Sequence, residues 1–498
     1  MPERALYTAA QTRELDRTAI EDFDIPGIRL MSRAGRAAFE LIQAQWPERP
    51  PLVIFCGTGN NGGDGYIVAR LAHERGTPTV IYQLGDSAKI RGDAARARTA
   101  ALESGVEVRA FSDRAPPDTG ALESAVVVDA MLGTGLAGDV RGDYAAAIEL
   151  INACGQPVLA IDIPSGLCSD SGRRLGVAVE AECTVTFIGV KRGLLTGDAP
   201  DYCGELHFAD LEVPDAVYAQ VPFQAERMVL EDLLTCLPAI TANSHKGRFG
   251  HALVVGGDLG MGGAALLASE AAARCGAGLV SAATRPANVP AFNARRPEIM
   301  AHGVESRAEL DALLPRASAA AVGPGLGQDA WGEQLLHLVS GSALPLVVDA
   351  DALNLLATNP GLAGARDGHW ILTPHPGEAA RLLGVDTAAI QADRFAAAAR
   401  LQERYGGVVV LKGAGTIISD GEHFAVCPYG NPGMASGGMG DVLSGVLVAL
   451  LAQGLCPWDA ARLGVCLHSA AADIAAEEGQ RGLLATDLMP ALRQLIDA

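Results

Sequence analysis

The chain has 498 residues, a length that predicts roughly two to four domains. Its formal net charge of −20 at pH 7 disfavours binding to nucleic acid and to anionic membranes, because both carry the same sign of charge. No apolar run approaches the roughly 20 residues that a transmembrane helix needs, so we expect no membrane contact.

The cysteines and histidines indicate neither a disulfide framework nor a transition-metal site. The ten cysteines are scattered, and the closest two, Cys456 and Cys466, lie ten positions apart without a C-x-x-C pair. The ten histidines form no H-x-H or H-x-x-x-H pair. We therefore expect buried thiols in a reducing compartment and no zinc. The first 23 residues are charged and lack the apolar core of a secretory signal, so we expect a cytoplasmic protein.

In the first half of the chain, short β-branched runs alternate with alanine-rich segments of helical length. We predict strands at 51–57, 77–84, 125–131, 157–164, 183–189 and 204–211, with helices over 64–75 and 142–153 among the intervening segments. Such alternation predicts a parallel sheet with helices on both faces. The pattern lapses at 211–229, where two prolines occur. We place the domain boundary there and expect domains at 1–220 and 226–498.

The second half restarts the alternation, which predicts a second α/β domain. We predict strands at 251–257, 278–284, 318–327, 345–351, 369–378 and 407–419, with a helix over 263–275. In open sheets of this kind, ligands bind at the carboxyl ends of the strands. Nearly every glycine cluster falls at a predicted strand end, so we expect the functional sites there.

Three strand ends of the first half carry polar residues that suit a ligand. A Gly/Asn loop, Asn60–Asp64, links the first predicted strand to a helix, and two later strands end at Asp129 and Asp162. Each aspartate alone equally fits a helix cap. Together with Asn61 and Ser165, however, Asp129 offers the oxygen ligands that a bound cation prefers. The turn after Asp129, 133–139, has a composition that fits a phosphate.

The segments GNNGGDGYIVARLA, DAMLGTGL and AIDIPSGL resemble the three signatures of the NAD(P)H-hydrate epimerase family, over about residues 10–215. This resemblance implies a Rossmann-like domain that binds the hydrated nicotinamide cofactor and inverts its ring carbon 6. It also implies a potassium ion at Asn61, Asp129 and Ser165. The implied contacts to the hydrate are Asn60, Asn61, Gly62, Gly63, Asp64, Gly133, Thr134, Gly135, Leu136, Ala137, Gly138, Asp139 and Asp162.

Inversion at a carbon that bears both oxygen and nitrogen requires loss and return of the hydroxyl, and hence a placed acid/base group. We assign this role to Asp162. A second candidate is Lys191, in the segment GVKRGLLTG, although a lysine at a strand end is more often a solvated surface charge.

Near the C-terminus, the segment GNPGMASGGMGD places five glycines and Asp441 directly before an apolar helical run. The first amides of a helix lack internal partners and attract anions, and glycine lets an anion approach closely. A flexible surface loop is the alternative for this segment alone. With the strand-end segments VVVLKGAGT, GPGLG and TPHPGE, it resembles the ribokinase-like fold. That resemblance implies Asp441 as the base and the amides of 437–440 as donors to the transferring phosphoryl group.

Together with GHALVVGGDLGMGGAALLASEAAARCGAGLV, these segments resemble the ADP-dependent NAD(P)H-hydrate dehydratase family over about residues 230–495. The fusion of both halves resembles the bifunctional hydrate-repair enzymes as a whole. The resemblance implies contacts to the hydrate from Ala264, Leu326, His375 and Asp441. It implies nucleotide contacts from Lys412, Gly413, Ala414, Gly415, Thr416 and Gly440. One departure is the segment GGDLGMGGA, which lacks the family's usual serine or tyrosine, so we expect this part of the substrate loop to pack differently.

The ligands that follow from the resemblance are NADHX, NADPHX and ADP, with Mg²⁺ accompanying the nucleotide, and we expect a homo-oligomer. Phosphorylation of the ring hydroxyl by the nucleotide, followed by loss of phosphate, would restore NAD(P)H. The main alternative for the second half is a vitamin or sugar kinase, with the first half as a ligand-binding or sensor module. A Rossmann dehydrogenase is disfavoured on the expectation that no strand is followed by the G-x-G-x-x-G fingerprint.

Overall fold

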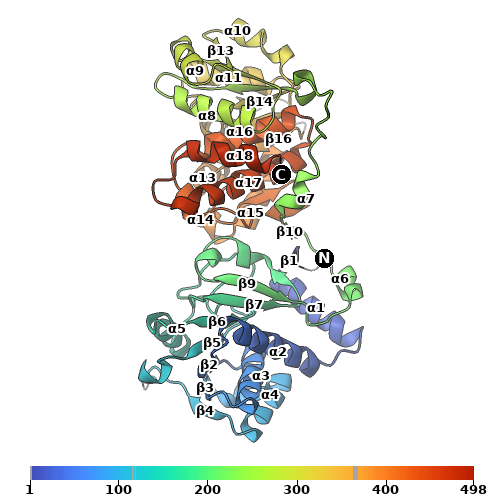
Figure 1. Ribbon diagram of the computed structural model, residues 1–498, viewed down its shortest axis with the longest axis vertical. Coiled ribbons are helices and arrows are strands. Elements are labelled where there is room, and N and C mark those ends of the chain that lie inside the picture. Colours follow the sequence, from blue (N-terminus) through green and yellow to red (C-terminus); the bar gives the residue numbers. More distant parts are fainter. Residues whose placement is uncertain (1–2, 115–116, 118, 363–367, 498) are drawn as a thin grey trace. The chain divides into compact units, whose positions relative to one another are not determined.

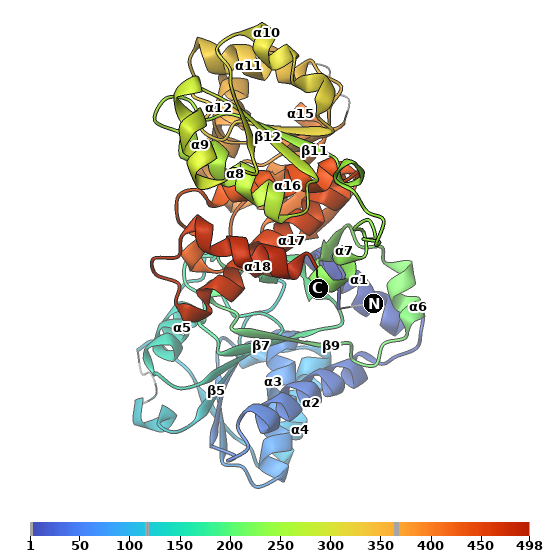
Figure 2. The same ribbon diagram turned by 45° about the horizontal axis from the view of Figure 1, so that its top comes forward.

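The computed structural model describes residues 3–114, 117, 119–362 and 368–497. The chain divides into two compact units, Met1–Glu226 and Arg227–Ala498, drawn in Figures 1 and 2. The division falls within 211–229, the segment in which the strand–helix alternation of the sequence lapses.

The first unit is built on a parallel sheet, as the sequence predicted. Among its described residues the strand order is β4-β3-β2-β5-β6-β7-β9, and all neighbouring strands run parallel. The strands are β2 (Leu52–Cys56), β3 (Thr79–Gln83), β4 (Glu107–Ala110), β5 (Val126–Ala130), β6 (Val158–Ile161), β7 (Cys183–Phe187) and β9 (Glu205–Ala209). The short strand β1 (Ala5–Tyr7) pairs in parallel with β8 (Val190–Lys191) and antiparallel with β10 (Ala225–Arg227).

Helices cover both faces of this sheet because successive strand residues point to opposite sides. The helices are α1 (Ala9–Glu21), α2 (Gly27–Gln45), α3 (Asn60–Glu74), α4 (Gly92–Glu103), α5 (Asp143–Ala153) and α6 (Asp215–Gln220). One core joins Ile54 and Val128 to α2, α3 and α4, and the other joins Phe55 and Val127 to α5 (Figure 2). Central strands buried on both faces explain the uninterrupted apolar runs of the sequence.

The second unit has a sheet that is parallel except at one end. Its order is β13-β12-β11-β14-β15-β16-β17-β18-β19, with β18 and β19 antiparallel to their neighbours. The strands are β11 (His251–Val255), β12 (Leu279–Thr284), β13 (Met300–Gly303), β14 (Ala319–Val322), β15 (Leu346–Val348), β16 (Trp370–Leu372), β17 (Val408–Leu411), β18 (Ile417–Ser419) and β19 (Phe424–Val426).

Helix α16 lies at the centre of this unit. Val442, Val446 and Leu450 have no exposed surface, and an α-helix that is apolar on all sides is normally buried. It packs with α8, α17 and α18 in the core on one face of the sheet (Figure 1). The helices of the unit are α7 (Leu230–Leu234), α8 (Gly262–Arg274), α9 (Val289–Arg295), α10 (Arg307–Asp311), α11 (Ala330–Ser340), α12 (Ala350–Thr358), α13 (Pro376–Leu383), α14 (Thr387–Ala392), α15 (Arg394–Tyr405), α16 (Met439–Ala452), α17 (Pro457–Ala475) and α18 (Leu488–Leu495).

The strand predictions failed at sheet edges and at one hairpin. Strands β4 and β13 lacked a signal because edge residues such as those of β4 are largely exposed and polar. The single strand predicted at 407–419 is two antiparallel strands, β17 and β18. They are separated by a loop whose Gly413 and Gly415 have positive φ angles of 143° and 58°, a backbone conformation that glycine adopts readily.

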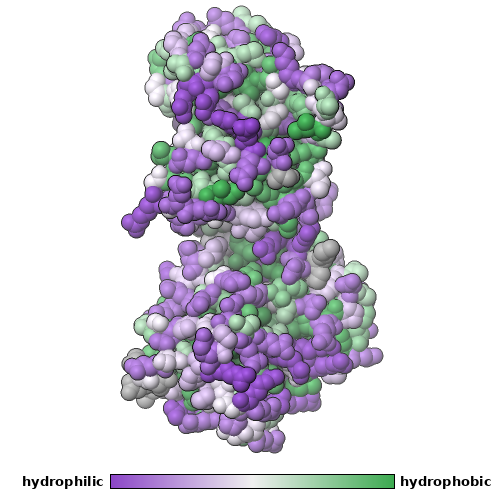
Figure 3. All heavy atoms as spheres, in the orientation of Figure 1, coloured by the Kyte–Doolittle hydropathy of each residue, from purple (hydrophilic) through white to green (hydrophobic). Residues whose placement is uncertain are grey.

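None of the helices that the structure describes is long and apolar enough to cross a bilayer. On the face drawn in Figure 3, hydrophilic residues predominate in both units and apolar residues are scattered among them.

Candidate active sites

The first unit contains a cavity of about 580 Å³ beside the carboxyl ends of β2, β5 and β6. It brings together three segments that are far apart in the sequence. The predicted hydrate contacts that line it are Asn60, Asn61, Asp64, Gly133, Thr134, Gly135, Leu136, Ala137 and Asp162. The other four, Gly62, Gly63, Gly138 and Asp139, are not among its lining residues.

Gly62 and Gly63 are required for close packing of the chain. A Cβ atom on Gly62 would overlap the carbonyl oxygen of Gly57, and one on Gly63 would lie 2.6 Å from the Cε of Met31. Both glycines belong to the first turn of α3, so they let this helix begin directly against the β2 loop and α2.

The expectation that the G-x-G-x-x-G fingerprint is missing was wrong. Gly57, Gly59 and Gly62 have that spacing between β2 and α3. The acidic residue that normally follows about 20 positions later to bind the ribose is absent, because β3 ends at Gln83. Gln83 is buried, accepts a hydrogen bond from Tyr66 and donates to the carbonyl of Leu84 at 2.7 Å. The fingerprint is therefore incomplete, and a dehydrogenase is disfavoured on this different ground.

Asp129 and Ser165 form a buried hydrogen-bonded pair, and Asn61 is also buried. The Asp129 carboxylate accepts hydrogen bonds from the Ser165 hydroxyl (2.6 Å) and amide (2.7 Å) and from the Met131 amide (3.1 Å). Burial raises the pKa of Asp129 to about 6. The Asn61 side chain is buried, and neither of its polar atoms has a hydrogen-bond partner. A buried carboxamide needs a partner such as an ordered water or an ion, and the oxygen atoms of these three residues fit a cation.

Asp162 and Lys191 form an ion pair at the cavity wall. Lys191 is fully buried, which overturns the interpretation of this lysine as a solvated surface charge. Its ammonium also donates to the Thr186 hydroxyl and the Phe187 carbonyl, both at 3.0 Å. Asp162 has a φ of 67°, and such backbone strain in a non-glycine residue is concentrated at functional sites.

The carboxyl groups of Asp64 and Asp16 also line this cavity. Burial, together with the nearby charge of Asp162, raises the pKa of Asp64 well above its ordinary value. Burial raises the pKa of Asp16, on α1, to about 6, although Lys191 opposes this shift. Sequence reasoning missed Asp16, because it lies on the polar side of an ordinary amphipathic helix and carries no motif.

The second unit places the predicted base at the start of α16. Gly438 precedes the helix with a φ of 90°, and Asp441 lies in the first turn. Burial and the charge of Asp349 raise the pKa of Asp441 to about 7. A carboxylate with such a pKa is a competent proton acceptor near neutral pH.

A lysine with 20% of its side chain exposed lies beside this helix start. Lys412 donates to Asp349 at 2.8 Å and lies 3.9 Å from Glu378, and its Nζ would be 3.2 Å from a Cβ on Gly440. Asp349 also accepts from the hydroxyl of Ser444, on α16, at 2.7 Å. Burial alone would raise the pKa of Asp349, but Lys412 lowers it overall. The structure therefore brings Lys412, Gly440 and Asp441 together, and adds Asp349 and Glu378, which sequence reasoning missed.

His375 both caps a helix and faces this site. Its Nδ1 accepts from the Gly377 amide at 3.0 Å, and its own amide donates to Glu378 at 2.8 Å, closing a capping box at α13. Half of its side chain is exposed, and burial followed by the charge of Lys412 lowers its pKa. The capping role and a ligand contact are therefore compatible.

The remaining predicted residues of the substrate loop differ in accessibility. Ala264, at the start of α8, is half-buried next to Gly325, whose added Cβ would lie 3.1 Å from the Cβ of Ala264. Leu326 has no exposed surface, so it is part of the core. Asp351, on α12, accepts from the Gly327 amide at 2.9 Å and fixes this turn.

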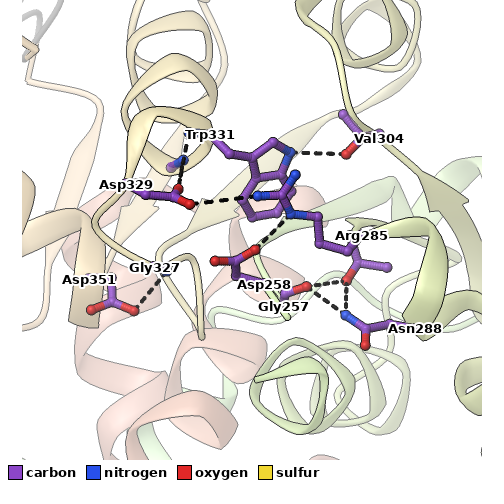
Figure 4. A network of polar contacts seen from close by, with 11 residues as sticks. Gly257, Asp258, Arg285, Asn288, Val304, Gly327, Asp329, Trp331 and Asp351 are labelled. Carbon is purple, nitrogen blue, oxygen red and sulfur yellow. Dashed lines mark hydrogen bonds and ion pairs between the residues drawn. The ribbon is translucent and has the colours of Figure 1, made fainter. Parts of the chain in front are cut away.

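An arginine that sequence reasoning missed holds this loop (Figure 4). Arg285 donates to Asp258 at 2.7 Å, lies 3.8 Å from Asp329 and stacks over the Trp331 ring at 4.3 Å. The indole in turn donates to the Val304 carbonyl at 3.0 Å. Because Asp258 follows the glycine pair of the loop, these contacts connect the loop that departs from the family pattern to α11.

Among the described residues, no group of three or more His, Cys, Asp or Glu side chains is placed to hold a metal ion. The residues Asn61, Asp129 and Ser165 provide one carboxylate and neutral oxygen atoms, so they differ from such a cluster.

The folds and the two strand-end sites define a two-domain α/β enzyme that joins a Rossmann-like unit to a ribokinase-like unit. Residues 27–193 match the family model described as the YjeF-related protein N-terminus, and residues 252–494 match that of NAD(P)H-hydrate dehydratase. The bifunctional NAD(P)H-hydrate repair enzyme of Coxiella burnetii is 49% identical over 494 residues, covering 99% of both chains. The chain belongs to the family of bifunctional NAD(P)H-hydrate repair enzymes.

One solved structure supports the fold of the second unit. A ribokinase-like superfamily protein from Enterococcus faecalis is 30% identical, with a TM-score of 0.52, over 55% of this chain and 95% of that one. An ADP/ATP-dependent NAD(P)H-hydrate dehydratase from Bacillus subtilis, co-crystallized with ATP/Mg²⁺, is 31% identical, with a TM-score of 0.47, over 54% of this chain and 96% of that one. The family and the fold class predicted from the motifs are thus confirmed.

Proposed function

We propose that the first unit interconverts the R and S hydrates of NADH and NADPH. The second unit then dehydrates the S hydrate at the expense of ADP, giving AMP and phosphate. Membership of the repair family supports this assignment. The observation that carries it is the ion pair of Lys412 and Asp349 beside Gly440 and Asp441, a buried charged site at the start of an apolar helix.

In the first unit, Asp162 is the acid/base group. The hydroxyl of ring carbon 6 departs as water after protonation, and the adjacent ring nitrogen stabilises the cation that is left. Water then returns to either face and loses its proton. Lys191 holds the Asp162 carboxylate at the cavity wall. Burial raises the pKa of Asp64 well above its ordinary value, so Asp64 supplies a neutral carboxyl group that donates a hydrogen bond without adding charge.

Asn61, Asp129 and Ser165 would hold the potassium ion. When bound, the ion supplies a fixed positive charge near the phosphates or the carboxamide of the hydrate. The unpartnered Asn61 side chain supports this assignment, because a buried amide without a partner is costly.

In the second unit, the ring hydroxyl attacks the β-phosphorus of ADP and gives its proton to Asp441. A new P–O bond forms as the bond to AMP breaks. Phosphate then leaves ring carbon 6 with the C–O electron pair, and the neighbouring carbon loses a proton, which restores NAD(P)H. The α16 amides and Lys412 stabilise the transferring charge.

Residues 412–416 hold the nucleotide in this proposal. Mg²⁺ would be held mainly by the nucleotide phosphates and by water, and when bound it would neutralise phosphate charge. A homo-oligomer and a cytoplasmic location stay predictions; light scattering on the purified chain tests the first.

The test combines the purified chain with an equilibrated mixture of R and S hydrates of NADH, ADP and Mg²⁺, and follows the absorbance of restored NADH. Complete, ADP-dependent recovery is expected. Asp441→Asn should abolish it, whereas Asp311→Asn, on an exposed part of α10, should not. Asp162→Ala should stop recovery at the S fraction. Nucleotide consumption only with vitamin or sugar alcohols would instead establish the kinase alternative.

A further inference from the structure

Arg394 is a buried cation that neither the motifs nor the proposed mechanism uses. It is the first residue of α15, and only 1% of its surface is exposed. Among the described residues, its guanidinium donates to the Gln391 side chain and to backbone carbonyls and forms no ion pair with a carboxylate. Burying a charge without a counter-charge costs several kcal/mol, so this position is poorly explained by stability alone.

The guanidinium reaches the loop between β17 and β18. Its Nη2 donates to the carbonyl oxygens of Leu411 (3.2 Å), Lys412 (3.4 Å) and Gly415 (3.4 Å). A Cβ on Gly413 would overlap its Nη1. The loop is therefore wrapped around Arg394, and this contact explains why a glycine stands at 413.

These hydrogen bonds also set the direction of the loop's amides. In a planar trans peptide the N–H points away from the C=O. Because the carbonyls of Lys412 and Gly415 point towards Arg394, the amides of Gly413 and Thr416 point the opposite way. Outward amides and a cation beneath them form an environment that favours an anion on the outer side of the loop.

We propose that Arg394 is a positioning residue for the nucleotide, holding the loop at 412–416 so that its amides receive the phosphates of a nucleoside diphosphate. The inference rests on the proposed role of this loop. It predicts that loss of Arg394 weakens nucleotide binding selectively, whereas a residue that only anchors α15 would affect the stability of the unit and leave affinity unchanged.

The experiment measures ADP affinity by calorimetry, and the KM values for ADP and the S hydrate, in the full chain. Arg394→Met should weaken ADP binding about tenfold or more, the loss of roughly one charge-assisted hydrogen bond, while the KM for the hydrate stays unchanged. Arg394→Lys, which keeps the charge but reaches fewer carbonyls, should fall between. Arg400→Met, at an exposed position on the same helix, is the matched control.

Three outcomes separate the proposals. Unchanged ADP affinity in Arg394→Met, or an equal rise in the KM of the hydrate, overturns the role of Arg394. If Arg394→Met does not fold, the KM ratio of Arg394→Lys decides in its place. Ala414→Asp places a negative charge on an exposed part of the loop. Unchanged ADP affinity there would contradict the loop's assignment to the nucleotide, whatever Arg394 does.

Discussion

The Asp162–Lys191 ion pair allows a quantitative test of how the first site is held. Lys191→Met removes a fully buried ammonium with three acceptors: Asp162, Thr186 and Phe187. Breaking a buried pair from one side costs about 3–5 kcal/mol. Because 17% of the Asp162 side chain is exposed and water in the cavity can solvate it, we expect the lower end, about 3 kcal/mol.

The second arm of this test is a double-mutant cycle. Asp162→Asn alone removes the negative charge that compensates the buried charge of Lys191, whereas Asp162→Asn combined with Lys191→Met removes both charges. The double variant should therefore be more stable than the sum of the single effects, with a coupling energy of about 1–3 kcal/mol.

The assay is hydrogen exchange of peptides from β6 and β7 in increasing urea, which isolates the first unit from the second. Arg109→Met, which breaks the exposed pair with Glu107, is the control and should leave exchange unchanged. If Lys191→Met behaves like this control, or if the two single effects add without coupling, the reasoning from burial is refuted.

Three further predictions concern the two sites. The dehydration rate should fall as pH drops below about 7, because Asp441 must be deprotonated to accept the hydroxyl proton and its pKa is raised to about 7. A rate that stays constant from about pH 6 to about pH 8, on both sides of this pKa, would contradict its role as base. Asn61→Ala should remove the response of epimerisation to added potassium, measured against sodium at equal ionic strength, and an unchanged response would place the ion elsewhere. Arg285→Met should raise the KM for the hydrate several-fold by loosening the loop at Asp258, with the KM for ADP as the internal control; equal changes in both would indicate general destabilisation.

Local sequence patterns identified most of the scaffold. Strand–helix alternation and long apolar runs predicted two α/β units, because parallel strands that are buried on both faces are apolar along almost their whole length. The glycine pattern ahead of α16 predicted an anion site for an equally local reason, the unpartnered amides of a helix start. Edge strands such as β4 escaped prediction, because one exposed face removes the apolar signal.

Interactions of charged residues with partners far away in the sequence could not be predicted from local patterns. Lys191 looks like a surface residue beside a strand end, yet it forms an ion pair with a carboxylate at the end of another strand. The sequence indicated a nucleotide contact for Lys412 but not its ion pair with Asp349. Asp16 and Arg394 lie on helices without any motif. Their roles depend on which loop each helix faces, and this is decided by packing.

The sequence by itself determined the family, the two α/β units and the strand ends at which function lies, since these follow from local periodicity and short motifs. Only the tertiary structure decided which residues of each motif face the site. Gly62 and Gly63 serve helix packing, and Leu326 is core. The tertiary structure alone decided which charges from separate segments interact. Electrostatic interactions depend on distance and burial in space, and a linear sequence contains neither.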